Sequence, residues 1–129
     1  MRAIDTNIAV RLFVRDAPAQ VKAAEAFVSE PFLLLPTVLL EAIWVLESSY
    51  QLPRQEIVEK TRGLLGMDTI WFASSADMVW VLDTYESGAD FADALHIALA
   101  AEAEATVFAT FDKRLARLRH APVIVEVAA

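Results

Sequence analysis

Four acidic residues, Asp5, Glu41, Asp93 and Asp112, each stand within or directly after an apolar run of the sequence. A carboxylate held against a hydrophobic core costs free energy unless a cation or hydrogen-bond donors compensate its charge. The shared setting of the four acids therefore indicates one site made of oxygen ligands, which Mg²⁺ or Mn²⁺ prefers. Bound divalent ions could lower the pKa of a water molecule and stabilise the leaving oxygen during phosphodiester cleavage.

Two of these acids are expected to follow strands, and each has a structural alternative. Asp5 could cap the helix that follows it, although Thr6 and Asn7 could cap that helix equally well. Asp112 could be a simple turn residue. Thr110, two residues before it, could offer its hydroxyl to a ligand or to a neighbouring carboxylate.

The other two acids lie in expected helices. A capping box that began at Thr37 would need its acid at Leu40, so Glu41 does not fit that role, and a function is favoured. Asp90 is interpreted as the N-cap of its helix. Asp93 then occupies the third helical position, where the helix dipole stabilises a carboxylate without preventing it from binding a ligand.

Composition limits the classes of protein. The chain has 129 residues, of which 57% are hydrophobic, and is expected to form a single domain over residues 1–129. Without cysteine it has neither disulfides nor thiolate metal sites. The sequence has no apolar run of membrane-spanning length and no apparent signal peptide, which predicts a cytoplasmic protein without membrane association.

The formal net charge of −7 argues against a surface that coats nucleic acid generally, but it does not exclude a nuclease. One local basic run offers candidate RNA contacts at Lys113, Arg114 and Arg117, with Arg119 and His120 beside them. The alternative is that this run is the solvated end of a helix.

The order of apolar patterns predicts an α/β fold with a mostly parallel sheet. A strand over residues 2–5 precedes two helices, over about 8–14 and 20–29, that could form a hairpin. The expected elements that follow are a strand at 32–35, a buried helix from Thr37 to about Tyr50, a helix from Pro53 to Gly66, a strand at 69–73, helices opening at Ser75 and Asp90, and strands at 106–110 and 123–125. Ligands in such folds bind beyond the carboxyl ends of the strands.

With these motifs in order, the sequence resembles the PIN-domain family and, within it, the VapC-type toxins of toxin–antitoxin pairs. The matching residues are Ile4-Asp5-Thr6-Asn7, Glu41, Asp93-Ala94-Leu95 and Thr110-Phe111-Asp112. The resemblance implies a three-layer fold with a central, mostly parallel sheet of four to five strands flanked by helices.

The resemblance also implies an endoribonuclease, a hydrolase that uses one or two Mg²⁺ or Mn²⁺ ions. Its catalytic acids would be Asp5, Glu41, Asp93 and Asp112, with Asp5, Asp93 and Asp112 binding metal, and with Thr6, Asn7, Thr110 and Asp90 in support. A homodimer and a cognate antitoxin that masks the site are implied as partners.

Two other functions are open on the sequence alone. Phosphoryl transfer through an aspartyl intermediate would use Asp5 as the nucleophile. The phosphatase pattern of that class needs an aspartate where Asn7 stands, and it leaves Glu41 unexplained. A non-enzymatic partner-binding module with a degenerate acidic pocket would be expected to have lost one of the four acids, and all four are present.

Overall fold

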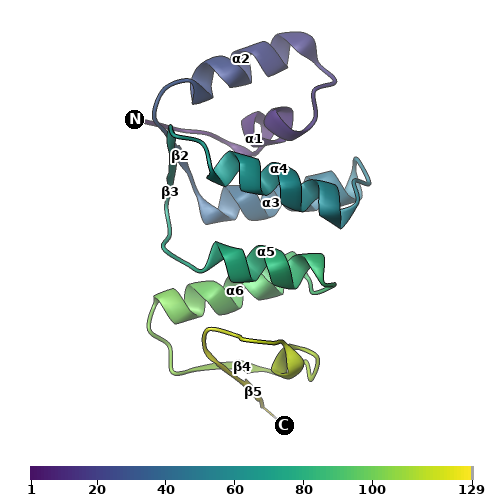
Figure 1. Ribbon diagram of the computed structural model, residues 1–129, viewed down its shortest axis with the longest axis vertical. Coiled ribbons are helices and arrows are strands. Elements are labelled where there is room, and N and C mark those ends of the chain that lie inside the picture. The colour runs from purple at the N-terminus through teal and green to yellow at the C-terminus, as the bar shows by residue number, and fades with distance from the viewer. Residues whose placement is uncertain (129) are drawn as a thin grey trace. The chain divides into compact units, whose positions relative to one another are not determined.

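The computed structural model describes residues 1–128 and divides the chain into two compact units, Met1–Ala73 and the part that begins at Ser74 (Figure 1). The first unit contains β1 (Arg2–Ala3), α1 (Thr6–Phe13), α2 (Pro18–Val28), β2 (Phe32–Leu34), α3 (Pro36–Ser48), α4 (Arg54–Leu65) and β3 (Ile70–Phe72). The second contains α5 (Met78–Glu86), α6 (Phe91–Glu102), β4 (Val107–Thr110), a 3₁₀ turn η1 (Leu115–Arg117) and β5 (Ile124–Val127).

All the strand pairs observed in the described residues are parallel, which confirms the predicted α/β class. Five strands form two sheets, with the order β1-β2-β3 in the first unit and β4-β5 in the second. The expected single domain over residues 1–129 stays a prediction. No helix within residues 1–128 is long and apolar enough to cross a membrane.

The centre of the first sheet is β2, where Phe32 and Leu34 are fully buried. Pro31 and Pro36 flank this strand and keep it short, because proline lacks the N–H that a ladder or a helix interior requires. Pro36 instead takes the first position of α3, where no N–H is needed. Consequently α3 begins with Leu35 as its N-cap, and the prediction that Thr37 caps it is wrong.

Helix α3 is buried on one face only. Its buried residues, Leu39, Ala42, Ile43 and Leu46, follow the spacing of a single helical stripe. Trp44 lies on the other side and is 64% exposed, so the prediction of a helix buried all round is wrong. Apolar residues occur on more than one face of α3, so the sequence did not distinguish the core face from the exposed one.

Helices α1 and α2 pack against each other as the predicted hairpin (Figure 1). Helix α2 contributes Val21, Ala24 and Val28 to the core, and Pro18 opens its first turn. Helix α4 follows Pro53, which is the N-cap rather than a residue of the first turn.

Helices α5 and α6 pack together in the second unit, and the rings of Tyr85 and Phe91 meet edge to face with centroids 5.5 Å apart. Asp77 caps α5 by accepting from the Trp80 N–H, so the prediction that Ser75 opens this helix is wrong. Ser75 is used elsewhere, since its N–H and hydroxyl both donate to Glu102.

Two glycines allow a matched test of this architecture. Gly88 has φ +123°, a backbone region that strains other residues, whereas Gly63 lies inside α4, where no atom of the described chain comes within 4 Å of an added Cβ. We expect Gly88→Ala to lower the free energy of unfolding by about 1–2 kcal/mol. Gly63→Ala should raise it by about 0.5–1 kcal/mol. Urea denaturation of both variants measures the changes, and equal effects would contradict the assignment of strain to Gly88.

Candidate active site

Asp5 is positioned by the end of β1. Buried Ile4 donates its N–H to the Leu33 carbonyl at 3.1 Å, which fixes the chain just before the acid. Asp5 then caps α1, with Oδ1 accepting from the Ile8 N–H at 3.0 Å. Asp5 is therefore the N-cap of α1, and this capping bond uses only one of its two carboxylate oxygens.

Glu41 is held next to this turn. The Thr6 hydroxyl donates to Glu41 Oε1 and so joins the start of α1 to α3. Glu41 is exposed, which corrects the expectation that its side chain is buried in an apolar setting. Because Thr6 follows Asp5 directly, this bond brings two predicted catalytic acids to one end of the first unit. Asn7 is exposed and lines, with Asp5, a cavity of about 360 Å³.

Asp90 and Asp93 form the start of α6 as predicted. Asp90 Oδ2 accepts from the Asp93 N–H at 3.1 Å, which is the expected N-cap. Asp93 is the third helical residue and is partly buried. The apolar residues of α6 that follow are packed in the core and hold this first turn in place.

Asp112 follows β4, and a network of short-range hydrogen bonds fixes it. Its N–H donates to Thr110 Oγ1 at 3.0 Å, so the Thr110 hydroxyl oxygen accepts from the backbone of Asp112. The Arg114 side chain donates to both carboxylate oxygens of Asp112, at 3.1 and 2.9 Å, and the Arg114 N–H adds a third bond at 2.9 Å. Arg114, expected among the RNA contacts, is thus the ion-pair partner of Asp112. The spacing Asp-x-Arg after a strand was the available signal for this pairing.

Three of these carboxylates face one cavity. Asp90, Asp93 and Asp112 line a pocket of about 250 Å³ in the second unit, together with Arg114 and Gly88. The structure therefore brings together the acids of the second unit, as it does Asp5 and Glu41 in the first. That Asp5 and Asp112 share one rim stays a prediction, because they belong to different units.

The pKa values of two carboxylates in this cavity are shifted in opposite directions. Burial, followed by the nearby charges of Asp90 and Asp112, raises the pKa of Asp93. Hydrogen bonds from Arg114 lower the pKa of Asp112. Asp112 thus has Arg114 as its own cationic partner. Asp93 is instead close to two other negative charges, which favour its protonated form.

The donor types in this cavity fit a hard divalent cation, since carboxylate oxygens are its usual ligands. The raised pKa of Asp93 adds an electrostatic reason, because a bound cation would relieve the repulsion there. Within residues 1–128, no three His, Cys, Asp or Glu side chains are grouped closely enough to enclose an ion. The second unit therefore supplies ligands of the correct type without a closed coordination sphere.

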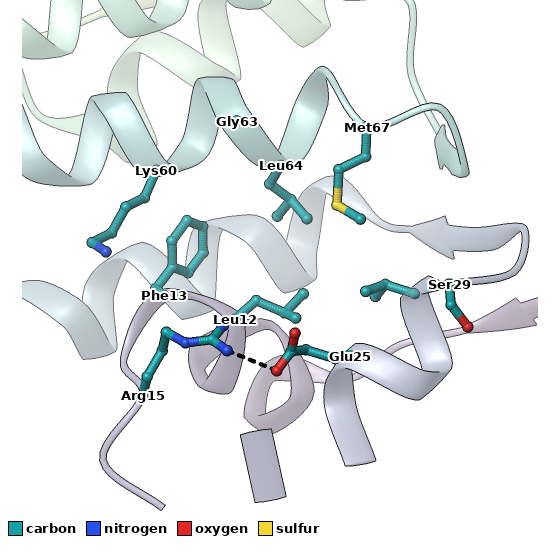
Figure 2. Close-up of a pocket in the computed structure, with 10 residues that line it drawn as sticks. Leu12, Phe13, Arg15, Glu25, Ser29, Lys60, Gly63, Leu64 and Met67 are labelled. Atoms are coloured by element: carbon teal, nitrogen blue, oxygen red, sulfur yellow. Dashed lines mark hydrogen bonds and ion pairs between the residues drawn. The ribbon is translucent and has the colours of Figure 1, made fainter. Parts of the chain in front are cut away.

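A larger cavity in the first unit has none of the candidate acids in its lining. It measures about 430 Å³ and is lined by residues of α1, α2 and α4, with the ion pair between Arg15 and Glu25 at its edge (Figure 2). Phe13, Leu64 and Met67 point into it. Nothing in this lining has the chemistry that the acids suggest, so the small acidic cavity is the better candidate site.

The fold and these side chains define a class of protein: a parallel α/β protein whose acidic residues follow strands and open helices. Comparison with protein families then gives one match, in which the PIN domain covers residues 3–121. The chain belongs to the PIN domain family. Proteins of this family are generally nucleases, so membership supports a hydrolase that acts on nucleic acids. No curated protein matches the sequence.

The two pKa shifts predict opposite effects of pH on stability. Asp93 holds its proton to a higher pH in the folded state, so its contribution to stability falls as pH rises through its raised pKa. The Asp112 contribution is fully present above the ordinary pKa of aspartate and is lost as pH falls through the lowered pKa. Arg114→Gln should raise both pKa values, because the side-chain hydrogen bonds of Arg114 lower the pKa of Asp112 and its charge lowers that of Asp93.

Carboxyl-carbon NMR titration measures both pKa values directly. Lys22→Gln is the matched control, since this exposed lysine on α2 belongs to the other unit. Values for Asp93 and Asp112 that are the same in wild type and Arg114→Gln would show that Arg114 does not compensate the cavity.

Proposed function

We propose that the protein is a divalent-metal-dependent endoribonuclease, the cytoplasmic toxin of a toxin–antitoxin pair. The observation that carries the proposal is the cavity that Asp90, Asp93 and Asp112 line, in a chain of the PIN domain family. The ordered motifs that resemble VapC-type toxins support the finer assignment. The proposal includes a homodimer and an antitoxin that covers the acidic site.

In this proposal the carboxylates act on the scissile phosphodiester through bound metal ions. Asp93 and Asp112 would hold one or two Mg²⁺ or Mn²⁺ ions. A bound ion supplies a water of lowered pKa and neutralises charge on the leaving oxygen. The titrations of acids that share an ion are coupled, so the general base is assigned to the acidic set and not to one residue.

The remaining residues position these acids. Thr6 holds the Glu41 carboxylate by its hydrogen bond, which orients the fourth acid. Asp90 fixes the first turn of α6 and so the direction of Asp93. Thr110 fixes the turn that carries Asp112, while Asn7 is exposed and could contact water or substrate.

The proposal predicts RNA cleavage that requires both the metal and Asp93. Wild-type protein incubated with a mixed pool of RNA should cleave with Mg²⁺ or Mn²⁺ and stop with EDTA. Asp93→Asn should lower the rate at least about a hundredfold, because several kcal/mol of charge stabilisation depend on the ion. Asp68→Asn, which changes an exposed aspartate outside the candidate site, is the control and should cleave like wild type.

Calorimetric titration with Mg²⁺ gives a second readout that does not depend on finding the preferred RNA. Binding should weaken in Asp93→Asn and stay unchanged in Asp68→Asn. Equal Mg²⁺ binding by wild type and Asp93→Asn, or equal cleavage by both, would leave Asp93 as a helix residue only and would refute the proposal.

A further inference from the structure

A second cavity adjoins the acidic one in the same unit. It measures about 310 Å³ and shares Ser87 and Leu118 with the carboxylate cavity as common wall. Its remaining lining comes from α5, from the last residue of η1 and from the segment that follows η1. A ligand lying across the shared wall would therefore contact both cavities at once.

The basic side of this cavity is held by defined contacts. Trp80 Nε1 donates to the Arg119 carbonyl at 2.8 Å and ties the segment after η1 to α5. The Arg117 N–H donates to the Arg114 carbonyl at 3.1 Å, which closes the 3₁₀ turn. His120 adopts φ +58°, so the chain reverses direction just after Arg119. These bonds fix the backbone from which the basic side chains extend.

The charge of this lining differs from that of the neighbouring cavity. Arg117, Arg119 and His120 line this cavity, and Asp83 is the one acidic residue in its lining. Within residues 1–128 neither guanidinium is ion-paired, and both side chains are exposed. Arg114 differs from them, because Asp112 occupies its guanidinium. In a chain of net charge −7, two unpaired arginines at one cavity form a local site for an anion.

We propose that this basic cavity binds a phosphate of a single-stranded RNA substrate, next to the phosphate that reaches the acidic cavity. The inference rests on the proposed nuclease function and identifies where the substrate strand runs. A strand carries phosphates in succession, so one can occupy the basic cavity while its neighbour meets the acids. The concave shape fits a flexible single strand, because a base-paired helix presents a broad surface that cannot enter a pocket of about 310 Å³.

Arg117 and Arg119 are accordingly substrate-binding residues, and Trp80 is a positioning residue. The basic run from Lys113 to His120 therefore contains arginines with two different roles. Arg114 serves Asp112, whereas the two later arginines serve the substrate.

The test measures binding of a fluorescent single-stranded RNA by Asp93→Asn protein with EDTA present, so that no cleavage occurs. Adding Arg117→Gln and Arg119→Gln should weaken binding about tenfold at 50 mM salt. The slope of log affinity against log salt should become shallower by about 0.7, since this cavity contacts one phosphate and each phosphate contact to a single strand contributes about 0.7. Melting temperature and circular dichroism verify that the variants fold.

Lys22→Gln with Lys60→Gln is the matched control, since it removes the same charge from the first unit. If the control and the arginine variants lose the same affinity for RNA, the loss is explained by net charge alone, and the inference is overturned. Duplex RNA bound as tightly as the single strand, with the same dependence on Arg117 and Arg119, would also overturn it.

Cleavage by protein that retains Asp93 separates this inference from the function on which it rests. The arginine variant should show a raised KM, with kcat within about twofold of wild type, because the acids are intact. Wild-type cleavage with no change of KM in the arginine variant would refute the basic cavity and leave the nuclease standing. Absence of metal-dependent cleavage in wild type and control alike would refute the nuclease itself.

Discussion

Repulsion between carboxylates is the constraint on which the second unit depends. Asp90, Asp93 and Asp112 line one cavity, where burial and then the charges of Asp90 and Asp112 raise the pKa of Asp93. The cost is limited by fixed donors: a helix N-terminus serves Asp90 and Asp93, and Arg114 serves Asp112. The compensation is incomplete at Asp93, whose pKa stays raised. A fold gains no stability from such an arrangement, which is why perturbed acids in a cavity point to function.

The first unit handles its acids differently. Asp5 and Glu41 are both exposed, so desolvation is small, and each accepts one defined hydrogen bond. Local structure thus holds these side chains in place without a buried ion pair. Sequence reasoning treated capping and function as competing interpretations of Asp5, but a carboxylate has two oxygens and can serve both.

Much of the fold could be predicted from the sequence because its signals were local. Short apolar runs between proline and polar residues located the strands, and Asp90 was predicted correctly as the N-cap of α6. The errors came where tertiary partners decided the outcome. Ser75 looks like a helix start, yet its N–H and hydroxyl bind Glu102 from a distant helix, so Asp77 caps α5. Nothing near Ser75 in sequence indicates that partner.

The same distinction explains the candidate site. The acids could be selected by residue type and setting, whereas their partners required coordinates. Arg114 and Arg117 look alike in sequence, three residues apart in one basic run. The turn after β4 directs Arg114 to Asp112, and the bond from Trp80 to Arg119 holds the later residues beside α5. An acidic chain can therefore present two unpaired cations to a polyanion at one place while its net charge discourages binding elsewhere. On this view the net charge of −7 favours selectivity for strands that reach the basic cavity, and so does not count against a nuclease.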